Sequence, residues 1–393
     1  MVYVNMPLGS THGWGVLGKN LALELGRLEP VRIINEPFPL SAIGDALEYH
    51  ELLRLSLPAE EAAMLLAGNG SRLLDGPLLQ GVGGERLLPR RPQLRSKMTF
   101  GYCVFENNLL HPAWIENGRR CFRKLVAGST WCAGVLTEAG LDGVEAVPHG
   151  VDPLIFRPAA DENHGREFFA DKFVVFSGGK FELRKGQDVV IRAYKVLQER
   201  HADAMLVNAW NNPWPATLET MRNSRLIRFA PRRGSFVDAI NQILADNGID
   251  PQRVITCPLQ LNLAMARIYR NTDVGVFPNR CEGGTNLVMM EYMACGRPVI
   301  AVNTTGHADI VTSSNALVIG TKGETVVRGA DGAPVARWPE PDLEDAIDKL
   351  EWAYQNRDKM RELGEQAGRE LAVRTWSKTA QAFQKIIHET AGS

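Results

Sequence analysis

The feature that most constrains the fold is an alternation of short apolar segments with amphipathic segments, which runs along the chain and restarts once. The apolar segments 2–6 and 31–35 predict strands, and the segment between them predicts a helix. Leucines three or four residues apart form one face of that helix: Leu17, Leu21, Leu25 and Leu28. Strands separated by helices predict parallel sheets that are covered by helices on both faces.

The restart follows a polar stretch without pattern, residues 157–172, which we interpret as a linker between two domains. A strand at 173–176 and a helix at 187–200 begin the second alternation, and a hairpin turning on Asp331 and Gly332 comes near its end. The remaining strands of this half are predicted at 204–210, 254–259, 274–278, 298–302 and 316–320. We therefore predict an α/β protein with two doubly wound domains, and a ligand site in the cleft beyond the C-terminal strand ends.

Composition excludes several classes of protein. The chain has 393 residues, enough for two or three domains, and its net charge of −1 gives no basic excess for a nucleic-acid partner. Six scattered cysteines without a CxxC pair suit a reducing compartment. The first residues do not have the pattern of a signal peptide, and no apolar stretch approaches about 18 residues. We expect a cytoplasmic protein; peripheral contact with the inner membrane face and the oligomeric state stay open.

The most informative stretch is NRCEGGTNLVMMEYMACGRPVIAVNTTG, residues 279–306. It follows the apolar strand 274–278, so its glycine turn lies at a C-terminal strand end, and a helix starts near Thr285 or Asn286. A helix N-terminus after a glycine turn is a phosphate site. We expect Glu291 to accept hydrogen bonds from a ribose diol and Glu282 to face the hydroxyls of a sugar. Alone, the motif could equally be a capped helix beside a surface glutamate.

The stretch resembles the E-x7-E signature of retaining GT-B glycosyltransferases of the group-1 type, family 4. Other blocks resemble that family in the same order along the chain: HGWGVLGKNLALEL at 12–25, VPHGVDPLIFRP at 147–158, GKFELRKGQDVVIRA at 179–193, IYRNTDVGVFPNRCEG at 268–283 and EYMACGRPVIA at 291–301. The resemblance implies an N-terminal acceptor domain over 1–160, joined in space by 376–393. It also implies a C-terminal domain over 161–375 that binds the nucleotide sugar. Trp376 would belong to the final helix, which crosses back to the first domain.

Two departures from the family pattern affect the site. Eight residues separate Glu282 from Glu291 where the family has seven, so either a bulge keeps Glu282 in the site or Gly283 takes its place. We favour the bulge. Lys180 stands where the family has arginine, at the same spacing from Lys185. The lysine ammonium is a point charge that can bind phosphate, but it lacks the two-point hydrogen bonding of a guanidinium.

The resemblance also implies roles for individual residues. Lys180 and Lys185 would hold the diphosphate of the donor and stabilise its developing charge. The turn would supply further donor contacts from Gly283, Gly284, Thr285, Asn286 and Leu287. The loop Gly13, Trp14 and Gly15 would reach phosphate and acceptor, although a tight turn alone would also explain the two glycines.

In the first domain, Glu106 follows a strand at a position where many relatives carry a histidine near the transferred sugar. We hypothesise that Glu106 lies at the reaction centre and acts with Glu282 and Lys185; His111 is the weaker candidate. We interpret His149 as a turn residue at the domain boundary, Asp309 as structural and Arg184 as solvated. The position of segment 256–260 after its strand suggests that its main-chain groups hold the base of the nucleotide.

Together with these residues, the resemblance implies a metal-independent enzyme without a cofactor. It would move a hexose from a nucleotide-diphosphate sugar to a glycan, lipid-linked or small-molecule acceptor, with retention of configuration. Two alternatives remain: a sugar-nucleotide epimerase on the same fold, which needs no acceptor, and a non-catalytic nucleotide-sugar binding module. A Rossmann dehydrogenase is disfavoured because 12–18 lacks the full glycine fingerprint. Arginines between 86 and 95 could meet an anionic acceptor or simply form a solvated basic loop.

Overall fold

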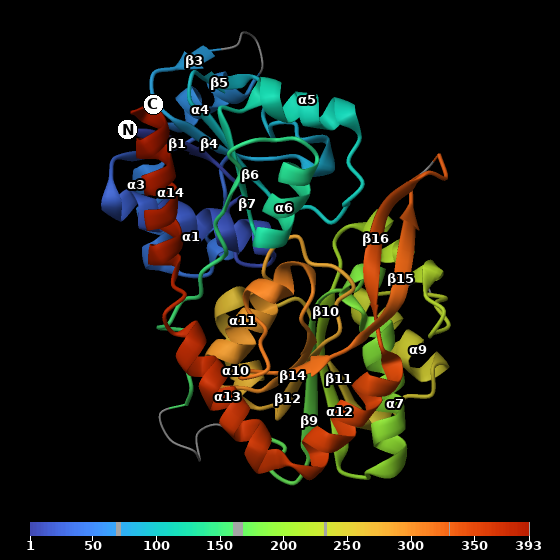
Figure 1. Ribbon diagram of the computed structural model, residues 1–393. Helices are drawn as coiled ribbons and strands as arrows, with labels where there is room; N and C mark the ends of the chain where they lie inside the picture. The colour runs from blue at the N-terminus through green and yellow to red at the C-terminus, as the bar shows by residue number, and fades with distance from the viewer. Residues whose placement is uncertain (68–71, 160–167, 232–233, 330, 393) are drawn as a thin grey trace.

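A computed structural model describes residues 1–67, 72–159, 168–231, 234–329 and 331–392. Two six-stranded sheets form the centres of two α/β units that lie one above the other in Figure 1. In each sheet all neighbouring strands pair in parallel. The fold is therefore the predicted pair of doubly wound, Rossmann-like units.

The first sheet has the strand order β2-β1-β4-β6-β7-β8. Its strands are β1 (Val2–Asn5), β2 (Val31–Ile33), β4 (Leu78–Gly81), β6 (Thr99–Cys103), β7 (Lys124–Ala127) and β8 (Glu145–Ala146). Its helices are α1 (Gly13–Leu28), α2 (Leu40–Ile43), α3 (Ala46–Leu55), α4 (Ala59–Leu66), α5 (Pro112–Cys121) and α6 (Thr130–Glu138). A small parallel pair, β3 (Arg72–Leu74) with β5 (Leu94–Ser96), lies outside this sheet.

The second sheet has the order β11-β10-β9-β12-β13-β14. Its strands are β9 (Phe173–Lys180), β10 (Ala204–Asn211), β11 (Val254–Thr256), β12 (Val274–Phe277), β13 (Val299–Val302) and β14 (Leu317–Ile319). Its helices are α7 (Gln187–Arg200), α8 (Pro215–Leu218), α9 (Phe236–Asp246), α10 (Asn262–Arg270), α11 (Leu287–Ala294), α12 (Leu343–Gln355) and α13 (Arg357–Leu371).

The final helix, α14 (Trp376–Ala391), packs on α1 and so belongs to the first unit in space (Figure 1). Trp376 and Phe383 are buried in the same apolar core as Leu17 and Leu21 of α1. The chain crosses between the units beside its earlier crossing, where the amide of Val151 donates to the carbonyl of Arg374 at 2.8 Å. The predicted return of the C-terminus to the first unit is thus present in the structure.

Some expectations from the sequence need amendment. Sequence patterns predicted no strand between residues 40 and 95, but this segment contains β4, a central strand whose four residues are all buried. Leu28 ends its helix 37% exposed, unlike the three leucines before it. Residues 160–167 of the interpreted linker and the boundary drawn at 160 lie outside the described residues.

The predicted hairpin is present and is longer than expected. It pairs β15 (Thr321–Arg328) with β16 (Pro334–Pro341) in antiparallel register and projects from the second unit towards the first (Figure 1). Its turn contains Asp331 and Gly332, whose φ of 79° favours glycine; residue 330 lies outside the described part of the chain. The hairpin inserts between β14 and α12 without joining either main sheet.

Candidate active site

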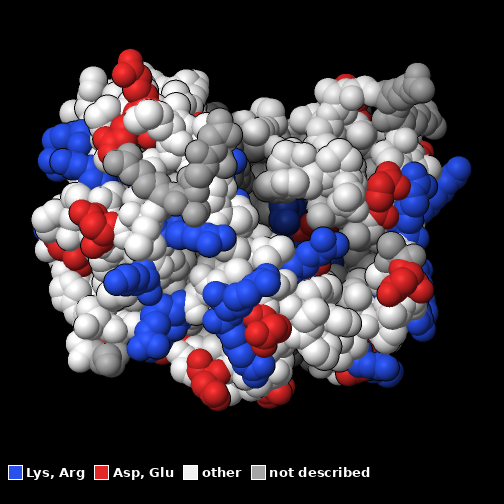
Figure 2. All heavy atoms as spheres, turned by 90° about the horizontal axis from the view of Figure 1, so that it is seen from above, with Lys and Arg blue, Asp and Glu red and all other residues white. Residues whose placement is uncertain are grey.

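A cleft of about 600 Å³ lies between the two units, at the C-terminal ends of both sheets. Seen from above, the molecule is hollowed between its halves, and charged side chains are visible inside the hollow (Figure 2). The predicted site residues that line the cleft are Gly13, Trp14, Glu106, Lys180, Lys185, Glu282, Gly284, Asn286, Leu287 and Glu291. Gly15, Gly283 and Thr285, also predicted, are not in its lining.

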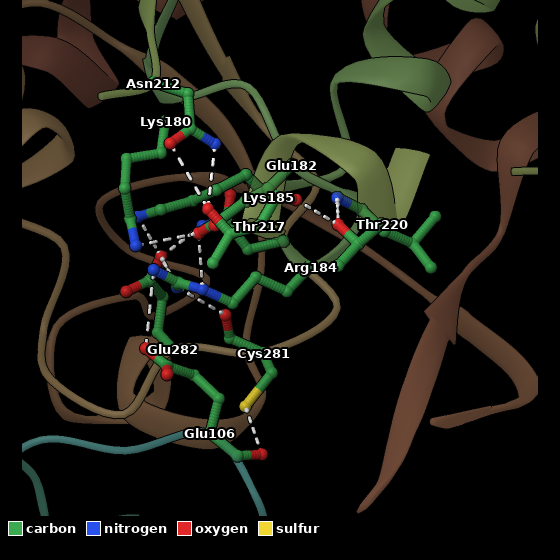
Figure 3. Close-up of polar contacts among 12 residues, drawn as sticks. Glu106, Lys180, Glu182, Arg184, Lys185, Asn212, Thr217, Thr220, Cys281 and Glu282 are labelled. Atoms are coloured by element: carbon green, nitrogen blue, oxygen red, sulfur yellow. Dashed lines mark hydrogen bonds and ion pairs between the residues drawn. The ribbon is translucent and has the colours of Figure 1, made fainter. Parts of the chain in front are cut away.

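Charged groups from both units meet in the cleft and form an ion cluster, which we define as Glu106, Lys180, Glu182, Arg184, Lys185 and Glu282 (Figure 3). Arg184 is at its centre, with Nε 2.7 Å from Glu182, Nη1 3.2 Å from Glu282 and Nη2 3.3 Å from Glu106. Lys185 donates to the same Glu282 oxygen. Three carboxylates thus balance three cations.

The expectation that Arg184 is solvated was wrong. Its side chain is only 11% exposed, because the short 3₁₀ turn Leu183–Lys185 directs it at the adjacent Glu182 and at two carboxylates from distant parts of the chain, Glu106 and Glu282. Those carboxylates keep it charged: burial alone would lower the pKa of the guanidinium, but Glu106, Glu182 and Glu282 raise it above its usual value.

The Glu282 carboxylate is held ionised by its neighbours. Burial alone would raise its pKa, but Lys185 and Arg184 lower it to about 2. Asn279 also donates to the same oxygen, at 2.6 Å. The ammonium of Lys185 is less favoured, since burial lowers its pKa despite the adjacent Glu282. Glu282 is therefore paired with Lys185, one of the two cations that were predicted to bind phosphate.

The glycine turn explains how the eight-residue spacing is accommodated. Glu282 directs its carboxylate into the cleft, whereas Gly283 packs its main chain against the first unit, where Ser129 Oγ donates to its carbonyl at 2.7 Å. A Cβ at position 283 would lie 2.1 Å from the carbonyl oxygen of Phe105, so no side chain fits there. Of the two residues considered for the first motif position, only Glu282 has a side chain facing the cleft.

The N-terminus of α11 also opens on the cleft. The helix follows Asn286, which adopts a left-handed conformation with φ of 59° and makes no side-chain cap bond. The first amide donors of α11 therefore have no cap within the described residues, and they carry the partial positive charge of a helix N-terminus. This geometry suits an anion such as phosphate.

Glu291, one helical turn further along α11, lies in a neutral pocket. Its carboxyl accepts from Asn262 Nδ2 at 2.6 Å and from Tyr269 Oη at 3.2 Å. Burial raises its pKa to about 8, because these two neutral donors compensate the lost water only in part. A raised pKa favours the protonated carboxyl at neutral pH.

The first unit contributes the opposite wall. Trp14 lies at the start of α1, with its ring edge-on to Tyr102. His12 caps this helix by accepting from the amide of Gly15 at 3.1 Å, so that amide is already used within the loop. Gly13 does line the cleft, with α11 next to it, since a Cβ there would lie 3.9 Å from Leu287.

His149 and Asp309 connect the two units. His149, expected only as a turn residue, lines the cleft with Nδ1 3.2 Å from Thr285 Oγ1, and burial lowers its pKa to about 4. Asp309 accepts from the amide of Thr130 at 2.8 Å and from its hydroxyl. Asp309 thus has the structural role expected of it.

Glu106 follows β6 and reaches the ion cluster through Arg184, so the structure places it at the meeting point of the two units (Figure 3). His111 instead caps α5, accepting from the amide of Ala113 at 3.1 Å, and it is absent from the cleft lining. Between these two candidates, the geometry favours Glu106.

Sequence reasoning missed part of the second unit's wall. Trp214 faces the cleft, with Lys180 Nζ 5.0 Å from its ring centroid and His12 of the first unit edge-on to it. Asn262 and Tyr269, the partners of Glu291, were also missed. Tyr269 lies in the family-like block 268–283 but was given no role there, and Asn262 lies outside every block that resembles the family. Of the segment 256–260, expected near a base, residues 257–260 line the cleft and Thr256 does not.

Comparisons with known proteins identify the class that this fold and site define. Residues 171–331 match the family described as "Glycosyl transferases group 1". The computed structure is similar over 100% of its length to sucrose-phosphate synthase from Thermosynechococcus elongatus, covering 99% of that chain with a TM-score of 0.66 at 16% identity. Anabaena HepE in complex with UDP and glucose aligns over 99% of both chains, with a TM-score of 0.65 at 12% identity.

Curated relatives point the same way. The chain is 26% identical over 252 residues to a D-inositol 3-phosphate glycosyltransferase of Pseudarthrobacter chlorophenolicus, covering 64% of this chain and 51% of that protein. It is 29% identical over 197 residues to a GDP-mannose-dependent alpha-(1-6)-phosphatidylinositol monomannoside mannosyltransferase of Mycolicibacterium smegmatis, covering 48% and 44%. The chain thus spans about half the length of these relatives. The fold is GT-B, and the resemblance to group 1 glycosyltransferases is confirmed.

The described residues contain no group of three or more His, Cys, Asp or Glu side chains that could hold a metal ion. Among the helices described, none is both long and apolar enough to cross a membrane.

Proposed function

We propose that this chain transfers a hexose from a nucleotide-diphosphate sugar to an acceptor hydroxyl with retention of configuration, without a metal or cofactor. One observation carries the proposal: the ion cluster, the uncapped N-terminus of α11 and Glu291 face one cleft in the order that a donor would need. We assign the donor to residues 161–375 and the acceptor to residues 1–160 with 376–393. The cytoplasmic location stays a prediction.

Each part of the donor has a matching group. The diphosphate fits between Lys180, Lys185 and the first amides of α11, where two cations and a helix N-terminus would stabilise the leaving group. The ribose diol fits Glu291, and the base fits the wall at 257–260. To bind, the diphosphate must displace Glu282 from Lys185, which would release that carboxylate to accept from sugar hydroxyls.

The chemistry proposed is front-face displacement. The bond between the anomeric carbon and the diphosphate breaks, a bond from that carbon to the acceptor oxygen forms on the same face, and the acceptor proton passes to the departing phosphate. Glu106, at the edge of the first unit, would orient the sugar or acceptor hydroxyl. Closure of the two units would exclude water from the donor.

The titles of similar proteins suggest which donors to test. HepE is described with UDP and with UDP-glucose, and the mannosyltransferase relative is named as GDP-mannose-dependent. The inositol phosphate and phosphatidylinositol in the relatives' names make small phosphorylated or lipid-linked acceptors the first to try.

The test is a panel of UDP- and GDP-hexoses in the presence of EDTA, followed by thermal shift and by release of nucleoside diphosphate. We expect one donor to raise the melting temperature and to be hydrolysed slowly, faster with an acceptor. NMR of the product should then show the same anomeric configuration as in the donor. Donor binding without any release would favour a binding module, and isomerisation of the donor without an acceptor would favour an epimerase. Absence of binding would refute the phosphate site.

A further inference from the structure

The hairpin β15–β16 contacts the loop that carries Glu106, although it belongs to the other unit. Trp338 Nε1 on β16 donates to the carbonyl of Glu106 at 2.8 Å. Asn108 pairs with the main chain of Arg337, donating to its carbonyl at 3.1 Å and accepting from its amide at 2.8 Å. The amide of Leu109 donates to the carbonyl of Val335 at 3.1 Å. Four hydrogen bonds thus fasten residues 106–109 to one edge of the hairpin.

A small apolar cluster seals the same junction. Cys281, Ala336 and Trp338 are buried together, and Trp131 from α6 of the first unit packs against them. Trp338 is only 6% exposed, so its indole N–H lies away from water, where a hydrogen bond to the carbonyl of Glu106 matters most.

The base of the hairpin is tied to the segment that carries Glu282. Arg280, two residues before Glu282, makes a bidentate pair with Glu340 at 2.6 and 2.7 Å. The same guanidinium pairs with Asp188 of α7 at 2.8 and 2.9 Å. Trp338 and Glu340 are two residues apart on β16, so one strand holds both Glu106 and the segment that carries Glu282.

We propose that Trp338 is a positioning residue for Glu106, and that the hairpin is the strap that sets Glu106 against Arg184 when the two units meet. This inference rests on the proposed function for the role of Glu106 in turnover, but the docking of the loop on the hairpin can be measured without it. The indole N–H fixes the Glu106 main chain, and the side chain then reaches Arg184 Nη2 at 3.3 Å.

The variant Trp338→Phe removes the N–H and keeps most of the buried ring. Trp352→Phe on α12 is the matched control: the same change in the same unit, at a residue packed against that unit's own core. Hydrogen exchange of a peptide spanning 104–111 reports the docking, because the amide of Leu109 donates to Val335. We expect exchange about three- to tenfold faster in Trp338→Phe, as for the loss of one buried hydrogen bond, and unchanged in the control.

Turnover of the sugar nucleotide found by the panel gives the second measurement. Trp338→Phe should lower kcat by about three- to tenfold and leave the donor KM unchanged, because the proposed donor contacts lie in the second unit. In a Glu106→Gln background, Trp338→Phe should cause little further loss, since both changes act through one group.

Any of three results would overturn the inference. These are unchanged hydrogen exchange at 104–111 in Trp338→Phe, an unchanged kcat in that variant, or a kcat in the double variant with Glu106→Gln that falls by the product of the two single losses. A wild-type protein without turnover on any donor would refute the proposed function instead. The exchange experiment would then still decide whether Trp338 positions the loop.

Discussion

Two glutamates on either side of one glycine turn differ in protonation: near neutral pH, Glu282 is ionised and Glu291 favours its neutral form. Glu282 is buried beside two cations, and its pKa is lowered to about 2; Glu291 is equally buried beside an amide and a phenol, and its pKa is raised to about 8. The partners of a buried carboxyl, and not its burial alone, therefore decide its charge. The cleft thus has a charged end, suited to diphosphate and sugar, and a neutral end, suited to a ribose.

The largest effect should come from breaking the charged end with Lys185→Ala. Loss of this cation should lower turnover by about 10² to 10³, as for other groups that stabilise developing charge. The free energy of unfolding should fall by about 2 kcal/mol, less than a buried pair usually loses, because Arg184 and Asn279 still face Glu282. Kinetics and urea denaturation measure the two effects.

The surface pair Lys195–Glu199 provides the control for that variant. Lys195→Ala should change the free energy of unfolding by less than about 0.5 kcal/mol and leave turnover intact. Equal effects at Lys185 and Lys195 would mean that the charged end is not a functional site.

Removing the competing anion with Glu282→Gln should have opposite effects on binding and on turnover. Lys185 would then be free for phosphate, so UDP or GDP should bind about tenfold more tightly, a gain of about 1.4 kcal/mol. Turnover should fall, since the sugar loses a charged acceptor. Titration calorimetry compares the variant with wild type and with Glu199→Gln. Weaker nucleotide binding in Glu282→Gln would show that Glu282 does not compete for Lys185.

The neutral end should appear in the pH dependence of stability. Between about pH 5 and 8, folded Glu291 keeps a proton that the unfolded chain has lost, so the free energy of unfolding falls as pH rises, by at most about 1.4 kcal/mol per unit. Glu291→Gln should remove this slope. His149 and His307, with pKa values lowered to about 4, act in the opposite sense below about pH 6.5, so the difference between the two proteins isolates Glu291.

Glu282→Gln is the counterpart in the same denaturation series. Because the pKa of Glu282 is lowered, its stabilising contribution is complete above about pH 5 and is lost only as pH falls towards 2. The difference between wild type and Glu282→Gln should therefore be flat from pH 5 to 8. If the unfolding free energies of Glu282→Gln and Glu291→Gln had the same pH dependence, the two carboxyls would not differ in protonation.

The smallest effect should follow from Asn262→Ala, which removes one of the two donors to Glu291. We expect a loss of about 1 kcal/mol in unfolding free energy and a higher apparent pKa for Glu291, seen as an upward shift of the pH at which the slope ends. Asn223→Ala, outside the cleft lining, is the control and should leave that pH unchanged.

The parts of the fold that could be predicted depend on local pattern. The restart of the alternation predicted two parallel-sheet units, and contiguous motifs predicted that Lys180, Lys185 and Glu291 share a cleft. The central strand β4 was missed because its four residues, Leu-Leu-Gln-Gly, are too few to show a period. The residue roles themselves stay predictions.

The parts that could not be predicted depend on contacts between distant segments. Arg184 was taken for a solvated residue because two of the three carboxylates around it, Glu106 and Glu282, come from distant parts of the chain. The neutral pocket of Glu291 needs Asn262 and Tyr269 from another helix, and the hold on Glu106 needs Trp338, more than two hundred residues away. No spacing in the sequence encodes such pairs.

The most direct test of the central claim is a crystal structure of the protein soaked with UDP or GDP. We expect the two phosphates within hydrogen-bond distance of Lys180, Lys185 and the first amides of α11, with Lys185 released from Glu282 and the ribose on Glu291. A nucleotide bound elsewhere, or phosphates in the cleft with Lys185 still paired to Glu282, would contradict it.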